Sequence, residues 1–329
     1  ACAFLFSVTL LVSPPCASAS DPFLQVRSYN PFTQVYGRPE FFAGWMADPG
    51  VSRAGSALSV VSFSEIEQRG GSQLELDGES YHLDHNYQRV LASRVEIGGR
   101  LPLLHYSGGW MDGMLTDWHD LLGVRNGHRD EQPRDALRLY FDDGLGNQVL
   151  VDDTGTGIGD LQLWTRYQLS RPGAGRQLAL HGGIKVPTGD AGKLTGSGAF
   201  DFSVGVGLSD PLSLRSIRTT LSANLGAVLL GAGDVLPAYQ KDSALFAGIQ
   251  AAVLLNRKLS LIGGVQATSA YYDADIGAIG EETIQLIFGG HYRLDSGWQV
   301  RLGIVEDGFS RVMPDFAVHL DVSRRLDSR

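Results

Sequence analysis

The feature that most constrains this chain is a repeated alternation of apolar residues with polar or small ones, in segments separated by turn residues, from residue 157 onward. Successive side chains of a β-strand point to opposite faces, so each segment has one oily face. In the first segment, Leu163 and Tyr167 oppose Arg166 and Gln168. Repetition of this pattern is typical of a membrane-spanning barrel, where one face meets lipid and the other the lumen.

The same alternation recurs along the rest of the chain. It covers residues 178–186, 200–208, 221–229, 245–255, 259–267, 284–294, 298–304 and 316–322. Counting segments predicts an all-β fold, a transmembrane antiparallel up-and-down β-barrel of about 12 strands, within a range of roughly 10–14. Residues 210–211, 256–257 and 295–297 are predicted short turns, whereas 108–135 and 231–242 are predicted long outer loops.

Composition narrows the class of protein further. The net charge of -9 argues against a nucleic-acid partner, because such a partner requires a concentrated basic face. After the N-terminus, no run of about 20 apolar residues could form a transmembrane helix. A membrane role must therefore come from strands.

The N-terminus is predicted to be a signal peptide over residues 1–19, which begins without Met or a basic region. An apolar run at 4–12 precedes two prolines and a small-residue stretch, and Ala17-Ser18-Ala19 gives an A-x-A cleavage site. Residues 20–329 would then form a single barrel domain. Both cysteines, Cys2 and Cys16, lie upstream of the cut, so the mature chain has no thiol chemistry. Lipidation at Cys16 is the alternative interpretation.

Four segments resemble an uncharacterised family of proteobacterial outer-membrane proteins, domain of unknown function 3187. They are Asp77-Gly78-Glu79-Ser80-Tyr81, the run 107–112 leading to Trp118-His119-Asp120-Leu121-Leu122-Gly123, Gly157-Ile158-Gly159-Asp160-Leu161, and Lys185-Val186-Pro187-Thr188-Gly189-Asp190 with 194–198. The resemblance implies a Gram-negative outer-membrane barrel and no particular activity.

Charged and polar residues on the face opposite the oily one predict the lining of the lumen. They are Asp160, Arg166, His181, Lys185, Asp201, Arg218, His291, Arg293 and Arg301. Unpaired cations would favour anions, whereas pairing with the acids would fill the lumen. The lumen could be packed with side chains and the N-terminal segment, or open to small solutes. We expect passive porin-like transport or a structural envelope role, with outer-membrane lipid and the barrel assembly machinery as partners; a receptor surface made by the loops is a third possibility.

A His-x-Ser pair offers an alternative function. His105 and Ser107 fall on the apolar, lipid-facing side of a predicted strand next to the long loop. The pair resembles that of outer-membrane phospholipases and lipid A deacylases, in which imidazole activates the hydroxyl for attack on an acyl ester. No orienting Asn, Glu or Asp can be assigned from sequence. Polar residues at the membrane interface explain the pair equally simply.

The long loop is predicted to contain a helix over residues 112–122, which would fold over or into the barrel mouth. Its notable residues are Asp112, Trp118, His119 and Asp120. A metal site would require His105, His119 and His128 to converge, and is not expected. Loop Ca²⁺ could bind the acids Asp142, Asp143, Asp152, Asp153 and Asp160, but hairpin turn chemistry accounts for them. We therefore predict no metal and no cofactor.

Overall fold

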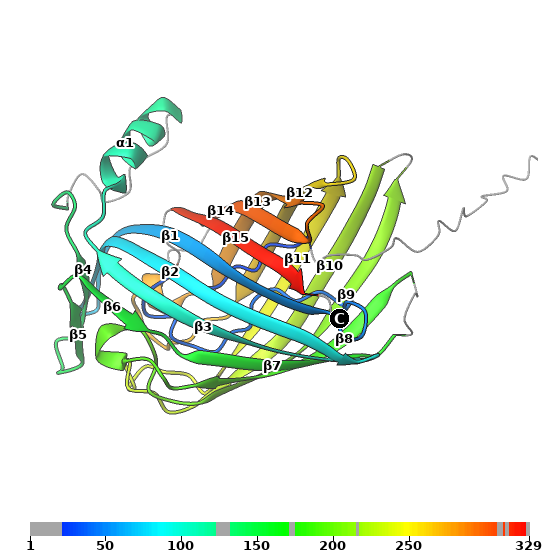
Figure 1. The fold of residues 1–329 in the computed structure, drawn as a ribbon. Helices are drawn as coiled ribbons and strands as arrows, with labels where there is room; N and C mark the ends of the chain where they lie inside the picture. Colours follow the sequence, from blue (N-terminus) through cyan, green and yellow to red (C-terminus); the bar gives the residue numbers. More distant parts are fainter. Residues whose placement is uncertain are drawn as a thin grey trace, which may run out of the picture.

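A closed antiparallel barrel forms the body of the chain (Figure 1). The computed structural model describes residues 22–122, 132–170, 175–214, 217–307, 312 and 316–326. The barrel strands are β1 (Ser52–Arg69), β2 (Ser72–Ala92), β3 (Val95–Ser107), β7 (Leu161–Gln168), β8 (Gln177–Val186), β9 (Asp201–Leu214), β10 (Ile217–Leu230), β11 (Ser243–Leu254), β12 (Leu259–Thr268), β13 (Thr283–Arg293), β14 (Trp298–Asp307) and β15 (Phe316–Leu326). The prediction of about 12 strands is confirmed, with 12 in the closed barrel.

The barrel closes where β15 pairs with β1, so that Leu326 lies opposite Ser52. Two short strands share the edge of β3. Residues 103–106 of β3 pair with β6 (Gly155–Ile158), and residues 95–100 pair with β7. β4 (Arg138–Asp142) and β5 (Gln148–Val151) extend the sheet from β2 beyond the barrel. The sheet therefore continues past the rim on one side only.

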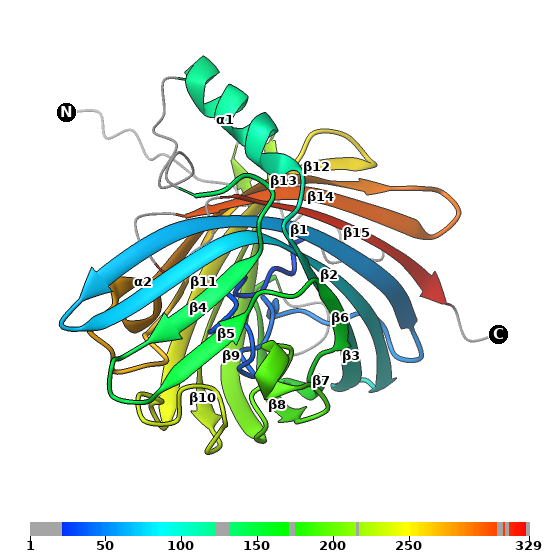
Figure 2. The ribbon, with the colours of Figure 1, turned by 90° about the vertical axis from the view of Figure 1, so that its left-hand side faces the viewer.

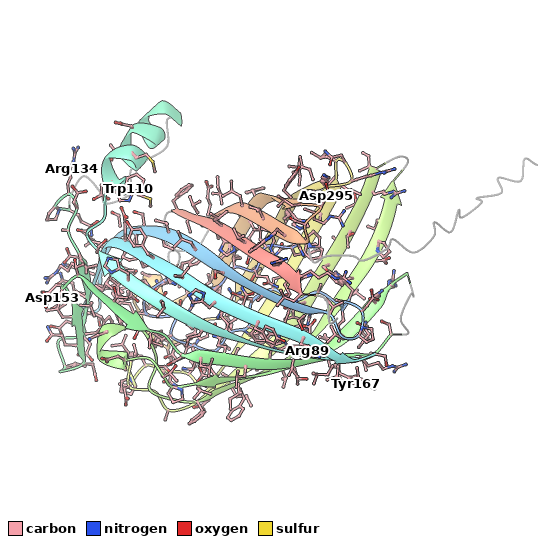
Figure 3. The ribbon with its side chains drawn as sticks, viewed as in Figure 1. Arg89, Trp110, Arg134, Asp153, Tyr167 and Asp295 are labelled. Atoms are coloured by element: carbon pink, nitrogen blue, oxygen red, sulfur yellow. The ribbon has the colours of Figure 1, made fainter. Side chains whose placement is uncertain are left out.

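The predicted alternation matches the two faces of the wall. Leu163, Tyr167 and Leu225 are exposed on the outside, and Figure 3 shows Tyr167 projecting away from β7. Arg166 and Gln168, on the alternate positions, are buried inside. The predicted turn at residues 210–211 is wrong, because both residues lie within β9, which continues to Leu214.

The two longest strands, β1 and β2, were not anticipated, because the sequence before residue 90 alternates poorly. The structure gives the reason. Near the β1–β2 turn the apolar positions face inward, since Val61 and Phe63 of β1 and Leu74 and Leu76 of β2 pack into a buried cluster inside the barrel. The alternating positions, such as Ser64 and Glu75, are polar and face outward, so the pattern is the reverse of the one in the later strands.

A tight turn joins these two strands. Gly70 and Gly71 have φ of 61° and 94°, a region that residues with a side chain rarely adopt. This glycine pair lets β1 and β2 stay paired up to Arg69 and Ser72. The ribbon therefore extends well beyond the barrel rim without fraying.

The connections at the two ends of the barrel differ in length. The end that holds Ser52 and Leu326 has short links, such as 93–94 and 255–258. The opposite end carries 108–160, 231–242 and 269–282, with α1 (Met111–Leu122) and α2 (Gly277–Gly280). The predicted asymmetry between short and long connections is therefore present.

No helix among the described residues is long and apolar enough to cross a membrane.

The predicted loop helix exists but points elsewhere. Figures 1 and 2 show α1 projecting outward from the rim, outside the outline of the barrel. The expectation that it folds over or into the mouth is therefore wrong. Residues 22–51 occupy the inside of the barrel instead.

Candidate functional site: the occluded lumen

Residues 22–51 run through the inside of the barrel without forming a strand, as the dark blue trace of Figures 1 and 2 shows. We call them the inner segment. Side chains of the wall satisfy its backbone: Gln250 accepts from Leu24 N at 3.1 Å and donates to Leu24 O at 2.8 Å. Gln285 likewise donates to Arg27 O at 2.9 Å. These amides replace the hydrogen bonds that a neighbouring strand would supply.

The inner segment also supplies the apolar core of the lumen. Its fully buried side chains are Phe23, Leu24, Tyr29, Phe32 and Phe41, and they pack with inward residues of β1, β2 and β4 and with the loop around α2. Burial of one such side chain contributes about 1.5–3 kcal/mol. The segment is therefore held firmly, and its spontaneous exit as a whole is disfavoured.

Crossed ion pairs join the inner segment to the wall. Arg27 of the segment lies 3.4 Å from Asp84 of β2, and Glu40 of the segment accepts a hydrogen bond from Arg100 of β3. Arg100 Nε also lies 3.8 Å from Asp84 Oδ1. Segment and wall thus each contribute one cation and one anion. Arg27 and Glu40 find these partners only while the segment stays in place, whereas Asp84 and Arg100 also face each other within the wall.

A second charged cluster surrounds Lys185 of β8, whose side chain is fully buried. Lys185 Nζ lies 2.8 Å from Asp160 Oδ2 and 3.1 Å from Asp201 Oδ2, and it donates to Val35 O of the inner segment at 3.0 Å. Asp201 Oδ2 also accepts from Gly37 N at 2.8 Å. Lysine and aspartates together fix this turn of the segment against the wall.

The other residues named for the lumen are buried and have partners that sequence alone left open. Arg166 Nε donates to Glu96 at 2.7 Å, and Arg301 Nη2 lies 2.7 Å from Asp321. His181 stacks on Phe42 of the inner segment, with ring centroids 4.5 Å apart. His291 Nε2 contacts Gln299 at 3.1 Å.

Two residues named as lumen cations share the inward register of their strands but lie at the strand ends on the side with the short links. Arg218 is exposed at the start of β10, and Arg293 ends β13, where it donates to Arg257 O at 2.7 Å. The remaining cations, Arg166, Lys185 and Arg301, are paired with carboxylates. The lumen described here therefore offers no support for anion preference based on these residues.

The residues that sequence reasoning missed belong mostly to the inner segment and its partners. Arg27 and Glu40 lie in a region with no strand pattern, and Asp84, Glu96 and Arg100 sit on strands whose inward faces were not assigned. One signal could have found the last two. Glu96 and Arg100 alternate with the outward Ile97 and Leu101, the same pattern that identified the later strands.

A cavity of about 50 Å³ remains between residues 37–42 and the wall of β3, β7 and β8. Arg100, Trp164, Arg166 and His181 are among its lining residues. Since one buried water needs roughly 10–15 Å³ of such volume, the cavity is large enough for a few waters.

His105 and Ser107 lie on the outward register of β3, with Ile97 and Leu101. His105 Nδ1 contacts Thr156 Oγ1 of β6 at 2.9 Å, and its ring lies 5.8 Å from that of Tyr81. The imidazole is thus engaged by a threonine of the neighbouring strand. The nearby carboxylate, Glu79, accepts from Tyr81 and from the start of α1. The contacts described for these residues do not assemble a nucleophile, base and acid.

The predicted residues of the loop helix are only partly visible. Asp112 Oδ2 accepts from Asp135 N at 3.0 Å and so ties α1 to the chain that follows the loop. The side chains of Trp118, His119 and Asp120 lie outside the described part of the structure, as does His128. In the residues that the structure describes, no group of three or more His, Cys, Asp or Glu could hold a metal ion.

Three of the five aspartates considered for Ca²⁺, namely Asp142, Asp143 and Asp160, serve turns or an ion pair. Asp143 Oδ1 accepts from Leu145 N at 2.7 Å and from Asn147 N at 3.0 Å, while Tyr239 donates to its Oδ2 at 2.8 Å. These hydrogen bonds, led by the one from the Asn147 side chain, lower the pKa of Asp143. Asp142 accepts from Gly144 N at 2.7 Å. Hairpin turn chemistry therefore accounts for both residues.

Together these features define a class: an outer-membrane-type β-barrel whose lumen is filled by its own N-terminal segment. The chain belongs to the family described as "Protein of unknown function (DUF3187)", whose model matches residues 3–326. No curated protein matches the sequence.

Solved structures share the architecture. An outer-membrane channel from Pseudomonas putida F1 is similar over 84% of this chain and 96% of its own, with 12% identity and a TM-score of 0.55. The NanC porin is similar over 84% of this chain and 100% of its own, with 8% identity and a TM-score of 0.43. The P. putida toluene transporter TodX is similar over 85% of this chain and 91% of its own, with 10% identity and a TM-score of 0.37. Of these three structures, the first has a TM-score above 0.5, which shows that it shares the fold of this chain.

Proposed function

We propose that this protein is an outer-membrane channel for small solutes whose resting state is closed by the inner segment. The observation that carries the proposal is the barrel filled by residues 22–51, which are bound both by an apolar cluster and by polar side chains of the wall. Contact with outer-membrane lipid and insertion by the barrel assembly machinery follow from that location and form part of the proposal.

The chemistry of the wall supports a passage behind the segment. The wall residues that hold the segment include Asp84, Arg100, Gln250, Gln266 and Gln285. Displacement of the segment would expose these polar groups to water, which solvates them well, together with inward apolar residues of the wall such as Val61, Ile262 and Ile287. Within the described residues, His181 Nδ1 and Gln266 Nε2 have no protein hydrogen-bond partner, so closure leaves two polar atoms of this interface unsatisfied.

The test is single-channel conductance of the protein in lipid bilayers. The full chain is expected to be silent or nearly so, whereas a variant lacking residues 22–50 is expected to give stable open-channel currents. A second variant keeps the chain length but replaces residues 23–42 with Gly and Ser. It should conduct intermittently, because it lacks the ion pairs and the apolar anchors of the native segment.

Two results would contradict the proposal. If both variants fold, as judged by β-sheet circular dichroism and heat-modifiable gel migration, and still pass no current, the barrel is not a channel. If the full chain conducts as well as the deletion variant, the inner segment does not close it.

A further inference from the structure

Helix α1 stands apart from the rest of the molecule. It leaves the barrel at the end with the long connections and extends sideways, away from the barrel axis (Figures 1 and 2). A helix with this direction at a barrel rim lies roughly parallel to the plane of a membrane around the barrel. Three features of the helix have a structural basis: its direction, its height along the barrel axis and its apolar face.

The direction is fixed by a carboxylate on the outer face of β2. Glu79 Oε1 accepts from Trp110 N at 2.7 Å and from Met111 N at 2.5 Å, and its other oxygen accepts from Tyr81 at 2.5 Å. An acidic group here satisfies free N–H groups at the helix start and suits the helix dipole. Gly109, with φ of 82°, is needed because a Cβ would collide with the Glu79 carboxyl group.

The height along the barrel axis is fixed by the strand that leads to the helix. On the outer face of β3, Ile97 and Leu101 are exposed apolar residues, and His105 and Ser107 then follow. The apolar band on this strand therefore ends just before α1 begins at Met111. Polar and aromatic residues mark the interface between hydrocarbon and headgroups in such barrels. Helix α1 begins at that interface.

The helix has one apolar face by its sequence spacing, with Met111, Met114, Leu115 and Trp118 on one stripe and Thr116 opposite. Met111 is buried against the barrel, but Met114 is 45% exposed and Trp110, at the base of the helix in Figure 3, is 61% exposed. Both side chains therefore present a large apolar surface to the surroundings.

We propose that α1 and Trp110 form an interfacial helix that rests on the outer leaflet of the membrane, with the apolar face in the zone between headgroups and acyl chains. The helix contains Asp112, Asp117 and Asp120 and neither Lys nor Arg, so it binds by apolar burial rather than by attraction to anionic lipid. This inference rests on the membrane location in the proposed function. It does not depend on conduction.

The test uses single cysteines labelled with an environment-sensitive fluorophore, in the full chain with Cys2 and Cys16 replaced by Ser. The sites are Met114→Cys on the apolar stripe, Thr116→Cys on the opposite face and Leu225→Cys on the exposed outer face of β10. Each protein is reconstituted in phosphatidylcholine vesicles, with and without lipids that carry a nitroxide near the headgroup. Quenching at 114 is expected to be comparable with that at 225 and much stronger than at 116.

The other outcomes are distinguishable. If 225 is quenched but 114 is not, the barrel is embedded and α1 stands away from the lipid, which overturns the inference. If the fluorophore at 114 is unquenched at high protein density and becomes quenched only when the protein is diluted in the bilayer, a second copy covers the apolar face in preference to lipid. The inference is then again wrong. If 225 is also unquenched, the membrane location fails, and the proposed function fails with it.

Discussion

Replacement of Lys185 by Met is expected to destabilise the folded barrel by about 3–5 kcal/mol, the usual cost of removing one partner from a buried ion pair. The side chains of Lys185 and Asp201 are at most 1% exposed, and Asp160 is 4% exposed, so both carboxylates would be left without their cation. The free energy of unfolding is measured by guanidinium titration of the vesicle-embedded protein, followed by tryptophan fluorescence.

Two variants make the Lys185 result specific. Lys258→Met removes an exposed lysine that pairs with Asp295 at the periphery, and we expect almost no change. Asp201→Asn added to Lys185→Met should recover part of the loss, because the site returns to the net charge that it has in the native protein. A Lys185→Met protein as stable as the native one would show that the cluster is not buried as described.

Replacement of Arg100 by Gln is expected to cost about 3–5 kcal/mol as well, because Arg100 serves two carboxylates, Glu40 of the inner segment and Asp84 of β2. Glu40→Gln should cost less, since Asp84 still faces Arg100 and Arg27. The double variant should be less damaging than the sum of the single ones. A double-mutant cycle in the same unfolding assay gives the interaction energy, expected at about 0.5–3 kcal/mol for residues in contact.

The same variants connect stability to closure. Arg100→Gln and Glu40→Gln weaken the attachment of the inner segment, so we expect brief current bursts in bilayers where the native chain is silent. Lys258→Met, outside the lumen, should stay silent. Strictly additive energies in the cycle would mean that Glu40 and Arg100 do not interact, and the ion pairs would then not hold the segment.

The sequence predicts which residues lie on the outer face of the barrel, because the two-residue period of side chains depends only on strand geometry. Leu163 and Tyr167 oppose Arg166 and Gln168 in whatever barrel this segment joins, and strands from β7 onward were found on this basis. The pattern reverses near the turn between β1 and β2, where Phe63 and Leu74 face an apolar core inside the lumen. Local pattern cannot distinguish a lumen filled with protein from lipid, since both accept apolar side chains.

The state of the lumen was decided by tertiary structure alone. Sequence placed Lys185, Asp160 and Asp201 on one face, but whether they would line a wet channel or neutralise each other depended on strand register and on what filled the space between them. The inner segment has no periodicity, because wall side chains such as Gln250, rather than a neighbouring strand, satisfy its backbone. Contacts between residues so distant along the chain leave no local sequence signal, so the sequence determined the wall and the fold determined its closure.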